Sequence, residues 1–209
     1  MLWSRWLKSE EDLLTFQVEF KLRAGNALDL DYLRASKVRG YFTSKGEMLA
    51  GFVMRTEGPL RYYGWLSAED RKPRPGDRVM PDDFVEITCI WMKKGRIHPF
   101  ERGQIYFESI ALAALSGKRA LLGGSFVEKV KDLQMLVMSF PYRKVDVESD
   151  GEHRTLWLYF GLRELVMPLY IKHMIIYAFH AGGRHHRNIR GRLRQVFLPP
   201  APARTTEKK

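Results

Sequence analysis

The stretch DFVEITCIWMKKGRIHPFERGQIYFESIALAALSG, residues 83–117, decides how the middle of the chain folds. Residues 83–92 are nearly continuous in apolar character, which is typical of a strand in the centre of a sheet. A basic, glycine-containing connection follows, and residues 104–116 then place apolar side chains at helical spacing. Gly117 is a natural stop for that helix. The stretch therefore predicts a strand, a polar loop and a helix in succession.

The flanking sequence extends this pattern in both directions. Residues 118–126 predict a short buried strand, and residues 128–140 predict an amphipathic helix. Two β-rich runs around the Asp-Gly pair at 150–151 predict a hairpin, and residues 37–56 predict another around Ser-Lys-Gly. Residues 28–36 are expected to form a short helix. This order predicts an α/β fold, with one central mixed sheet flanked by helices.

The N-terminal segment is less decisive. Residues 1–14 predict a helix, in which Ser9 and Asp12 resemble a capping box. Residues 15–22, TFQVEFKL, alternate apolar and polar side chains, which favours a half-buried strand. A continuing helix is the alternative, because Phe16 and Phe20 are also four residues apart.

Composition indicates one folded domain with a basic end. The chain has 209 residues, 45% of them hydrophobic, which is ample for a single core over residues 1–183. The single cysteine, Cys89, excludes an internal disulfide and is expected to be a small buried thiol. The start lacks the apolar core of a secretion signal, and no apolar run reaches the roughly 20 residues that span a membrane. We expect a soluble, cytoplasmic protein.

The net charge of +11 is concentrated in residues 184–209, where eight Lys or Arg face only Glu207. These residues predict a basic C-terminal tail that is partly disordered. Five arginines and two histidines within residues 184–194 indicate salt-sensitive contact with phosphate groups. Nucleic acid and an anionic membrane surface, beside the apolar segment 165–179, are alternative partners, and a solvated tail is the simplest alternative.

The order of elements over roughly residues 37–160 resembles the GNAT superfamily of N-acyltransferases. In that family the loop after the central strand carries a Gln/Arg-x-x-Gly-x-Gly/Ala motif, whose amides and following helix start hold the acyl-CoA pyrophosphate. The resemblance implies that Arg102, Gly103 and Gln104 lie at the phosphate and that Arg96 adds charge. Ile105 stands where the motif ends in Gly or Ala.

The resemblance also implies two catalytic residues. Glu86, on the central strand, corresponds to the base that removes a proton from the attacking amine. Tyr142, just after the second crossover helix, corresponds to the acid that protonates the departing thiolate. A solvent-facing Glu86 and a core Tyr142 are the simpler alternatives for these positions.

Two functional hypotheses follow from the sequence. The first is an acyltransferase that moves an acyl group from acyl-CoA, or from the thioester of an acyl carrier protein, to an amine acceptor. The second is a non-catalytic module that keeps the GNAT-like fold and engages nucleic acid or an anionic membrane through its basic C-terminus. The six histidines lack ligand spacing with a carboxylate or cysteine, so no metal is expected.

Overall fold

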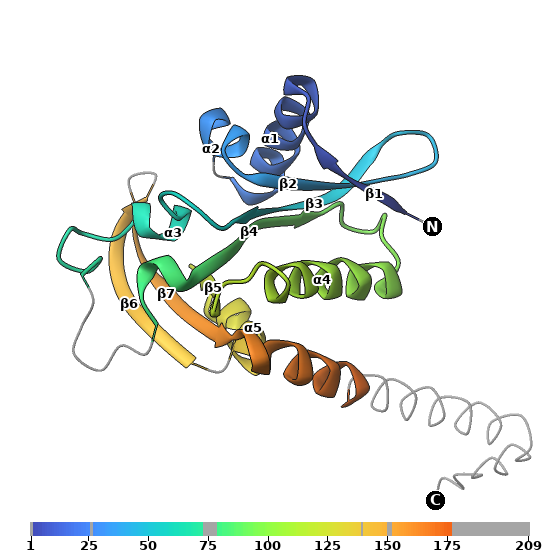
Figure 1. The fold of residues 1–209 in the computed structure, drawn as a ribbon. Coiled ribbons are helices and arrows are strands. Elements are labelled where there is room, and N and C mark those ends of the chain that lie inside the picture. The colour runs from blue at the N-terminus through green and yellow to red at the C-terminus, as the bar shows by residue number, and fades with distance from the viewer. Residues whose placement is uncertain (1, 26, 73–78, 139, 150–151, 177–209) are drawn as a thin grey trace, which may run out of the picture. The chain divides into compact units, whose positions relative to one another are not determined.

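The computed structural model describes residues 2–25, 27–72, 79–138, 140–149 and 152–176. Seven strands form one mixed sheet with helices along both faces (Figure 1). The elements are β1 (Trp3–Leu7), α1 (Glu10–Ala24), α2 (Leu30–Arg34), β2 (Lys37–Phe42), β3 (Met48–Arg55), α3 (Arg61–Gly64), the 3₁₀ turn η1 (Pro81–Asp83), β4 (Phe84–Met92), α4 (Pro99–Ala114), β5 (Ala120–Ser125), α5 (Glu128–Met138), β6 (Phe140–Ser149) and β7 (Glu152–Leu162). Residues 163–176 are also helical.

The strands are ordered β1-β2-β3-β4-β5-β7-β6, which places β4 in the middle of the sheet. Neighbouring strands are antiparallel except β4 and β5, which run parallel and are joined by the crossover helix α4. The predicted central strand and both hairpins are confirmed, and the turn of the second hairpin at 150–151 lies outside the described residues. The predicted fold class, an α/β domain with one mixed sheet, is confirmed.

The N-terminal predictions are wrong in part. Residues 3–7 form the edge strand β1 rather than a helix, and residues 15–22 belong to α1 rather than to a strand. Ser9 does cap this helix, since its side chain accepts a hydrogen bond from the Asp12 amide. Phe16 and Phe20 are buried on one face of α1, so the four-residue spacing determines the structure.

Two groups of helices cover the two faces of the sheet (Figure 1). Phe16 and Phe20 of α1 pack with residues of β2, β3 and β4 in one core cluster. On the other face, Ile105 of α4 and Met138 of α5 pack with β-strand residues that include Ile87. Burial on both faces accounts for the nearly continuous apolar character of β4.

A bulge interrupts the pairing of β3 and β4. Gly51 pairs with Trp91 but Val53 pairs with Thr88, so two residues of β4 stand opposite Phe52. Cys89, one of these two, has a φ of 53°, which is unusual for a residue other than glycine. A bulge bends its strand and increases its twist, so the second half of β4 departs from the line of its first half.

Residues 1–170 and 171–209 form two units. Within the first unit, Val166 and Tyr170 are buried. In the second, helical residues 171–176 expose most of their apolar side chains. Among the described residues, none of the helices combines the length and apolar character that crossing a membrane requires. The predicted basic tail, residues 184–209, lies outside the described residues.

Candidate functional site

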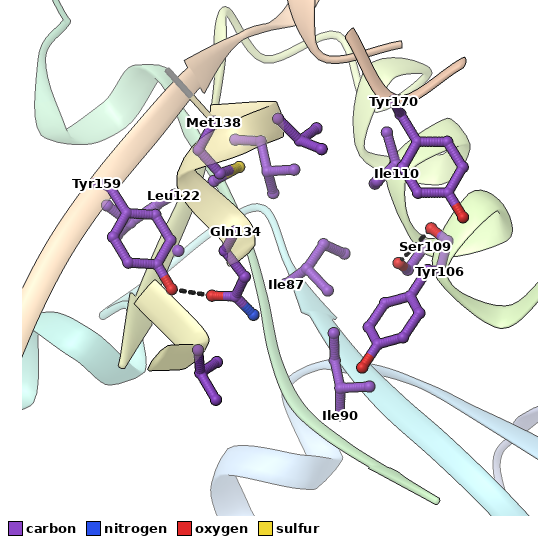
Figure 2. A pocket seen from close by; sticks show the side chains of 14 residues that line it. Ile87, Ile90, Tyr106, Ser109, Ile110, Leu122, Gln134, Met138, Tyr159 and Tyr170 are labelled. Carbon is purple, nitrogen blue, oxygen red and sulfur yellow. Dashed lines mark hydrogen bonds between the residues drawn. The ribbon is translucent and has the colours of Figure 1, made fainter. Parts of the chain in front are cut away.

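A cavity of about 320 Å³ lies between the crossover helices and the centre of the sheet (Figure 2). Strands β4 and β5 pair only from Phe84–Ala120 to Glu86–Leu122, and the cavity is lined both by Leu121 and Leu122 at the end of this pairing and by Ile87 and Ile90 beyond it. Its walls are mainly apolar and come from β4, β5, α4 and α5. They include Ile87, Ile90, Ile110, Leu121, Val137 and Met138. The separation of the two strands thus leaves a hollow that is lined by hydrocarbon.

One hydrogen-bonded pair brings polarity into this wall. Tyr159 of β7 is almost fully buried, and its hydroxyl donates to Oε1 of Gln134 on α5 (Figure 2). Its ring lies against Gly123, where a β-carbon would come within 2.6 Å of it. Burial raises the pKa of Tyr159, so the phenol is neutral at physiological pH. The Nε2 group of Gln134 has no other protein partner among the described residues and remains a donor at the cavity.

Tyr106 of α4 contributes a second polar group to the lining, and it is 38% exposed. Among the described residues its hydroxyl has no hydrogen-bond partner. By contrast, the Tyr170 hydroxyl donates to the Gly103 carbonyl at 2.8 Å, and the Ser109 hydroxyl donates to the Tyr106 carbonyl at 2.8 Å. The cavity therefore combines apolar walls with the donors of Gln134 and Tyr106.

From the sequence, aromatic residues that include Tyr106 and Tyr159 were expected either to line an apolar acyl pocket or to belong to the core, and both line this cavity. Gln134 was not identified as a site residue. Gln134 lies on the same helix face as Val130 and Val137, so a polar residue at an apolar-face position was the available signal.

The predicted start of the crossover helix is wrong. Helix α4 begins at Pro99, five residues before the predicted residue 104, and His98 is its N-cap. The Phe100 amide donates to Nδ1 of His98 at 3.2 Å, and the His98 amide donates to Oε2 of Glu101 at 3.1 Å. The other carboxylate oxygen of Glu101 accepts from the Leu2 amide. The amides at this helix start are therefore occupied by protein groups, and a carboxylate already stands where a phosphate would bind.

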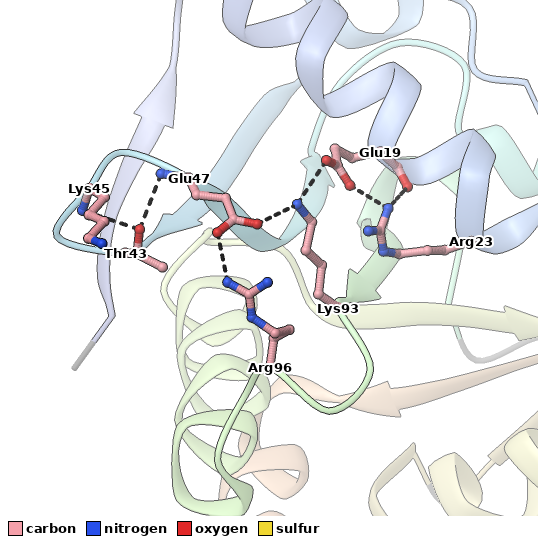
Figure 3. Close-up of polar contacts among 7 residues, drawn as sticks. All are labelled: Glu19, Arg23, Thr43, Lys45, Glu47, Lys93 and Arg96. Atoms are coloured by element: carbon pink, nitrogen blue, oxygen red, sulfur yellow. Dashed lines mark hydrogen bonds and ion pairs between the residues drawn. The ribbon is translucent and has the colours of Figure 1, made fainter.

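Arg96 precedes the helix and is held by a carboxylate. Its guanidinium lies 2.9 Å from Glu47, which also contacts Lys93 at 3.0 Å (Figure 3). Lys93 in turn contacts Glu19 of α1. The hydrogen bond from Lys93 is the largest of the effects that lower the pKa of Glu47. These ion pairs tie the connection between β4 and α4 to the β2–β3 hairpin and to α1.

Because the helix starts early, Arg102, Gly103 and Gln104 lie within α4 rather than in a loop. Arg102 and Gln104 are exposed, and the Gly103 carbonyl accepts the hydrogen bond from Tyr170. Their predicted role as ligands of a pyrophosphate stays a prediction. The geometry on which that prediction depended, a row of open amides at residue 104, is absent from this described helix.

Glu86 is fully buried at the end of the β4–β5 pairing. Its carboxylate accepts from the Tyr62 amide at 2.8 Å, from the Arg61 amide at 2.9 Å and from the Tyr32 hydroxyl at 3.1 Å. Burial raises the pKa of Glu86, although these three hydrogen bonds oppose the rise. The next residue, Ile87, lines the cavity, so Glu86 points to the opposite face of the sheet.

Tyr142 lies in β6, because α5 ends at Met138 and not at the predicted residue 140. Its ring packs against Phe84 and Phe160, and its hydroxyl is 3.2 Å from that of Tyr63. It does not belong to the lining of the β4–β5 cavity. Tyr142 and Glu86 share no hydrogen bond within the described part of the chain, and their catalytic roles stay predictions.

The order of elements around the mixed sheet is that of the GNAT fold, which solved structures of N-acyltransferases share with this chain. FeeM, an N-acyl amino acid synthase from uncultured soil microbes, is 12% identical, with a TM-score of 0.53 over 78% of this chain and 93% of FeeM. An N-acetyltransferase from Staphylococcus aureus Mu50 is 14% identical, with a TM-score of 0.51 over 78% of this chain and 99% of that one. The predicted resemblance to the GNAT fold is confirmed.

A third structure, yncA from Salmonella typhimurium, was solved with its cofactor acetyl-CoA. It is 9% identical, with a TM-score of 0.52 over 78% of this chain and 94% of yncA. At the level of sequence, no model of a known protein family and no curated protein matches the chain. Similarity at these identities establishes the fold and leaves the reaction to be argued from the site.

Proposed function

We propose that this protein is an acyltransferase that moves an acyl group from a thioester to an amine. The observation that carries the proposal is the apolar cavity where β4 and β5 separate, since a parted central pair lets an acyl thioester reach the middle of the sheet. Binding sites of this kind are concave, largely apolar and equipped with a few polar groups that fix orientation. The amide of Gln134 supplies a donor for the thioester carbonyl, where negative charge develops during transfer.

The thioester donor is proposed to be carried on a phosphopantetheine arm of an acyl carrier protein rather than on CoA. The start of α4 supports this choice, because His98 and Glu101 occupy its amides and the carboxylate repels a pyrophosphate. Arg96 is neutralised by Glu47 in the same region. A pantetheine thioester needs no pyrophosphate site, so these features do not hinder it.

The proton transfers are proposed to follow the roles predicted from the sequence. Glu86 stands at the last residue pair before the strands part, and burial raises its pKa, which makes it a stronger base than an exposed carboxylate. Two phenols compete for the acid role, Tyr142 and the cavity-lining Tyr106. Replacing each by phenylalanine separates them, because only loss of the true acid slows release of the thiol.

The experiment that tests the proposal measures thiol release and N-acyl product with the full chain. Decanoyl-CoA and decanoyl-pantetheine are offered with a panel of amino acids as amines, since FeeM is an N-acyl amino acid synthase. We expect kcat/KM for the two donors to agree within about threefold, because the nucleotide gains no contact at the capped helix start. Absence of product with every donor and amine would refute the acyltransferase, and a strong preference for CoA would refute the carrier-borne donor.

A second candidate function uses the unit that begins at residue 171, and we propose that it binds an anionic membrane surface. Its described residues are helical and expose Ile171, Met174, Ile175 and Ile176. The sequence that follows carries five arginines within residues 184–194. Apolar side chains beside clustered arginines fit a lipid surface better than nucleic acid, which offers the apolar groups no matching partner.

Sedimentation with vesicles tests this second function. The protein is expected to sediment with phosphatidylserine-containing vesicles at about 0.1 M salt and to be released at about 1 M salt. Ile175→Glu should weaken this binding, whereas Leu22→Glu, which alters an exposed leucine on α1, should not. Equal binding by both variants, or binding only to nucleic acid, would contradict the proposal.

A further inference from the structure

We infer that the cavity between β4 and β5 takes an acyl chain of medium length, roughly eight to twelve carbons, in preference to acetyl. This inference rests on the proposed function and adds the class of acyl donor.

The size of the cavity exceeds what an acetyl group requires. An apolar cavity of roughly 150 Å³ in another protein holds benzene, which has six carbons. The cavity here has about twice that volume, 320 Å³. By this comparison it accommodates roughly a dozen carbons, part of which belong to the thioester end. An acetyl group would leave most of it empty.

The walls favour hydrocarbon over water or a polar acceptor. The strands β4 and β5 contribute Ile87, Ile90 and Leu121 to the lining, and the helices α4 and α5 contribute Ile110, Val137 and Met138. Figure 2 shows Ile87, Ile90, Ile110 and Met138 around the cavity. An ordered water makes two to four hydrogen bonds to polar partners, and these six apolar side chains offer it none. When an alkyl chain fills such a space, the transfer of each methylene group out of water contributes favourably to the free energy of binding.

The polar groups that line the cavity are few enough to serve only one end of an acyl chain. Tyr159 is engaged with Gln134, and Ser109 and Tyr170 donate to main-chain carbonyls. The remaining donors, Nε2 of Gln134 and the hydroxyl of Tyr106, suit a single thioester carbonyl and its sulfur. A sugar or an amino acid would need several more partners than this lining provides.

A series of acyl-pantetheines from two to twelve carbons measures the preference directly. Each buried methylene contributes about fourfold, so burial of about half of the eight additional methylenes of decanoyl is enough to raise kcat/KM above that for acetyl by roughly a hundredfold or more. Decyl-pantetheine, a thioether that cannot react, gives a second readout, namely its binding to the full chain by calorimetry. Ethyl-pantetheine is the matched short ligand and is expected to bind at least about a hundredfold more weakly.

Two substitutions at Ile110 shift the preference in opposite directions. Ile110→Trp fills part of the cavity and should shorten the best chain by roughly two to four carbons, whereas Ile110→Ala should lengthen it. Leu115→Trp places the same indole at an 82% exposed position at the end of the same helix, and it should leave the chain preference unchanged.

The outcomes separate this inference from the proposed function. Tight binding of decyl-pantetheine without acyl transfer to any amine supports the acyl cavity and refutes the transferase. Transfer with equal or better use of acetyl, or decyl binding that Ile110→Trp leaves unchanged, overturns the acyl-chain assignment while the transferase stands. Failure of both the thioether and all thioesters overturns the two together.

Discussion

Replacing Glu86 by alanine is expected to lower the free energy of unfolding by about 3–5 kcal/mol. The carboxylate is fully buried and accepts from the first two amides of α3, those of Arg61 and Tyr62. Helix α3 has no side-chain cap of its own at Leu60, so Glu86 serves as its cap from a neighbouring strand. Without it, these amides and the Tyr32 hydroxyl lose their acceptor in a buried site.

Urea denaturation monitored by tryptophan fluorescence measures this loss. Glu86→Gln retains one acceptor oxygen and should lose less stability than Glu86→Ala, while Glu57→Ala, at an exposed position, should be nearly neutral. A loss of less than about 1 kcal/mol for Glu86→Ala would show that α3 does not depend on this carboxylate. If Glu86 is the base, Glu86→Gln should also abolish acyl transfer while it remains folded.

The pH dependence provides an independent check on the same residue. Burial raises the pKa of Glu86 above its unfolded value, so the folded protein binds this proton more tightly than the unfolded chain does. The stabilising contribution is therefore complete below the unfolded pKa of about 4.3 and is lost as pH rises through the folded pKa. The stability difference between wild type and Glu86→Gln should be largest near about pH 4 and smaller at about pH 8.

Much of the fold could be predicted from local patterns. Two hairpins, the central strand and the helix predicted over residues 128–140 have periodicities and turn residues that leave few alternatives. The structure confirms these elements and ends the helix at Met138. Residues 15–22 of α1 were wrongly predicted to form a strand, because Phe16 and Phe20 fit both the two-residue period of a strand and the four-residue spacing of a helix. Val18 and Leu22, which completed the apparent alternation, are exposed on the outer side of α1.

The helix start at Pro99 had a sequence signal that the family motif obscured. Proline is favoured at the first position of a helix, and Glu101 stands where a capping box places its carboxylate. Placing the motif on Arg102 to Gln104 moved the expected start five residues too far along the chain. The local capping residues predict the start of α4 better than the family motif does, because they form hydrogen bonds with the first amides of the helix.

The cavity itself could not be predicted from the sequence. Its opening lies where β4 stops pairing with β5 after Glu86, three residues before the bulge at Cys89 opposite Phe52. A bulge depends on how two strands pair, and the two residues that face each other here, Phe52 and Cys89, lie 37 positions apart in the chain. No local pattern in residues 84–92 marks the position.

Replacing Cys89 by valine is expected to lower the free energy of unfolding by about 2–3 kcal/mol. Burial raises the pKa of this thiol to about 11, so it is neutral and packs as a small apolar side chain. In an ordinary strand, valine would be a favourable substitute. At a φ of 53° its branched β-carbon meets the main chain, so the bulge is either strained or lost.

Cys89→Ala is the matched control, because alanine removes the same sulfur without branching at the β-carbon. Cys89→Ala should lower the free energy of unfolding by only about 1 kcal/mol. This loss is smaller than the one expected for Cys89→Val, although valine preserves more apolar contact. Calorimetry with decyl-pantetheine should show weaker binding to Cys89→Val than to Cys89→Ala, since a straightened β4 closes the gap beside β5. If valine proved as stable as wild type and bound the thioether equally well, the bulge at Cys89 would not be what holds the cavity open.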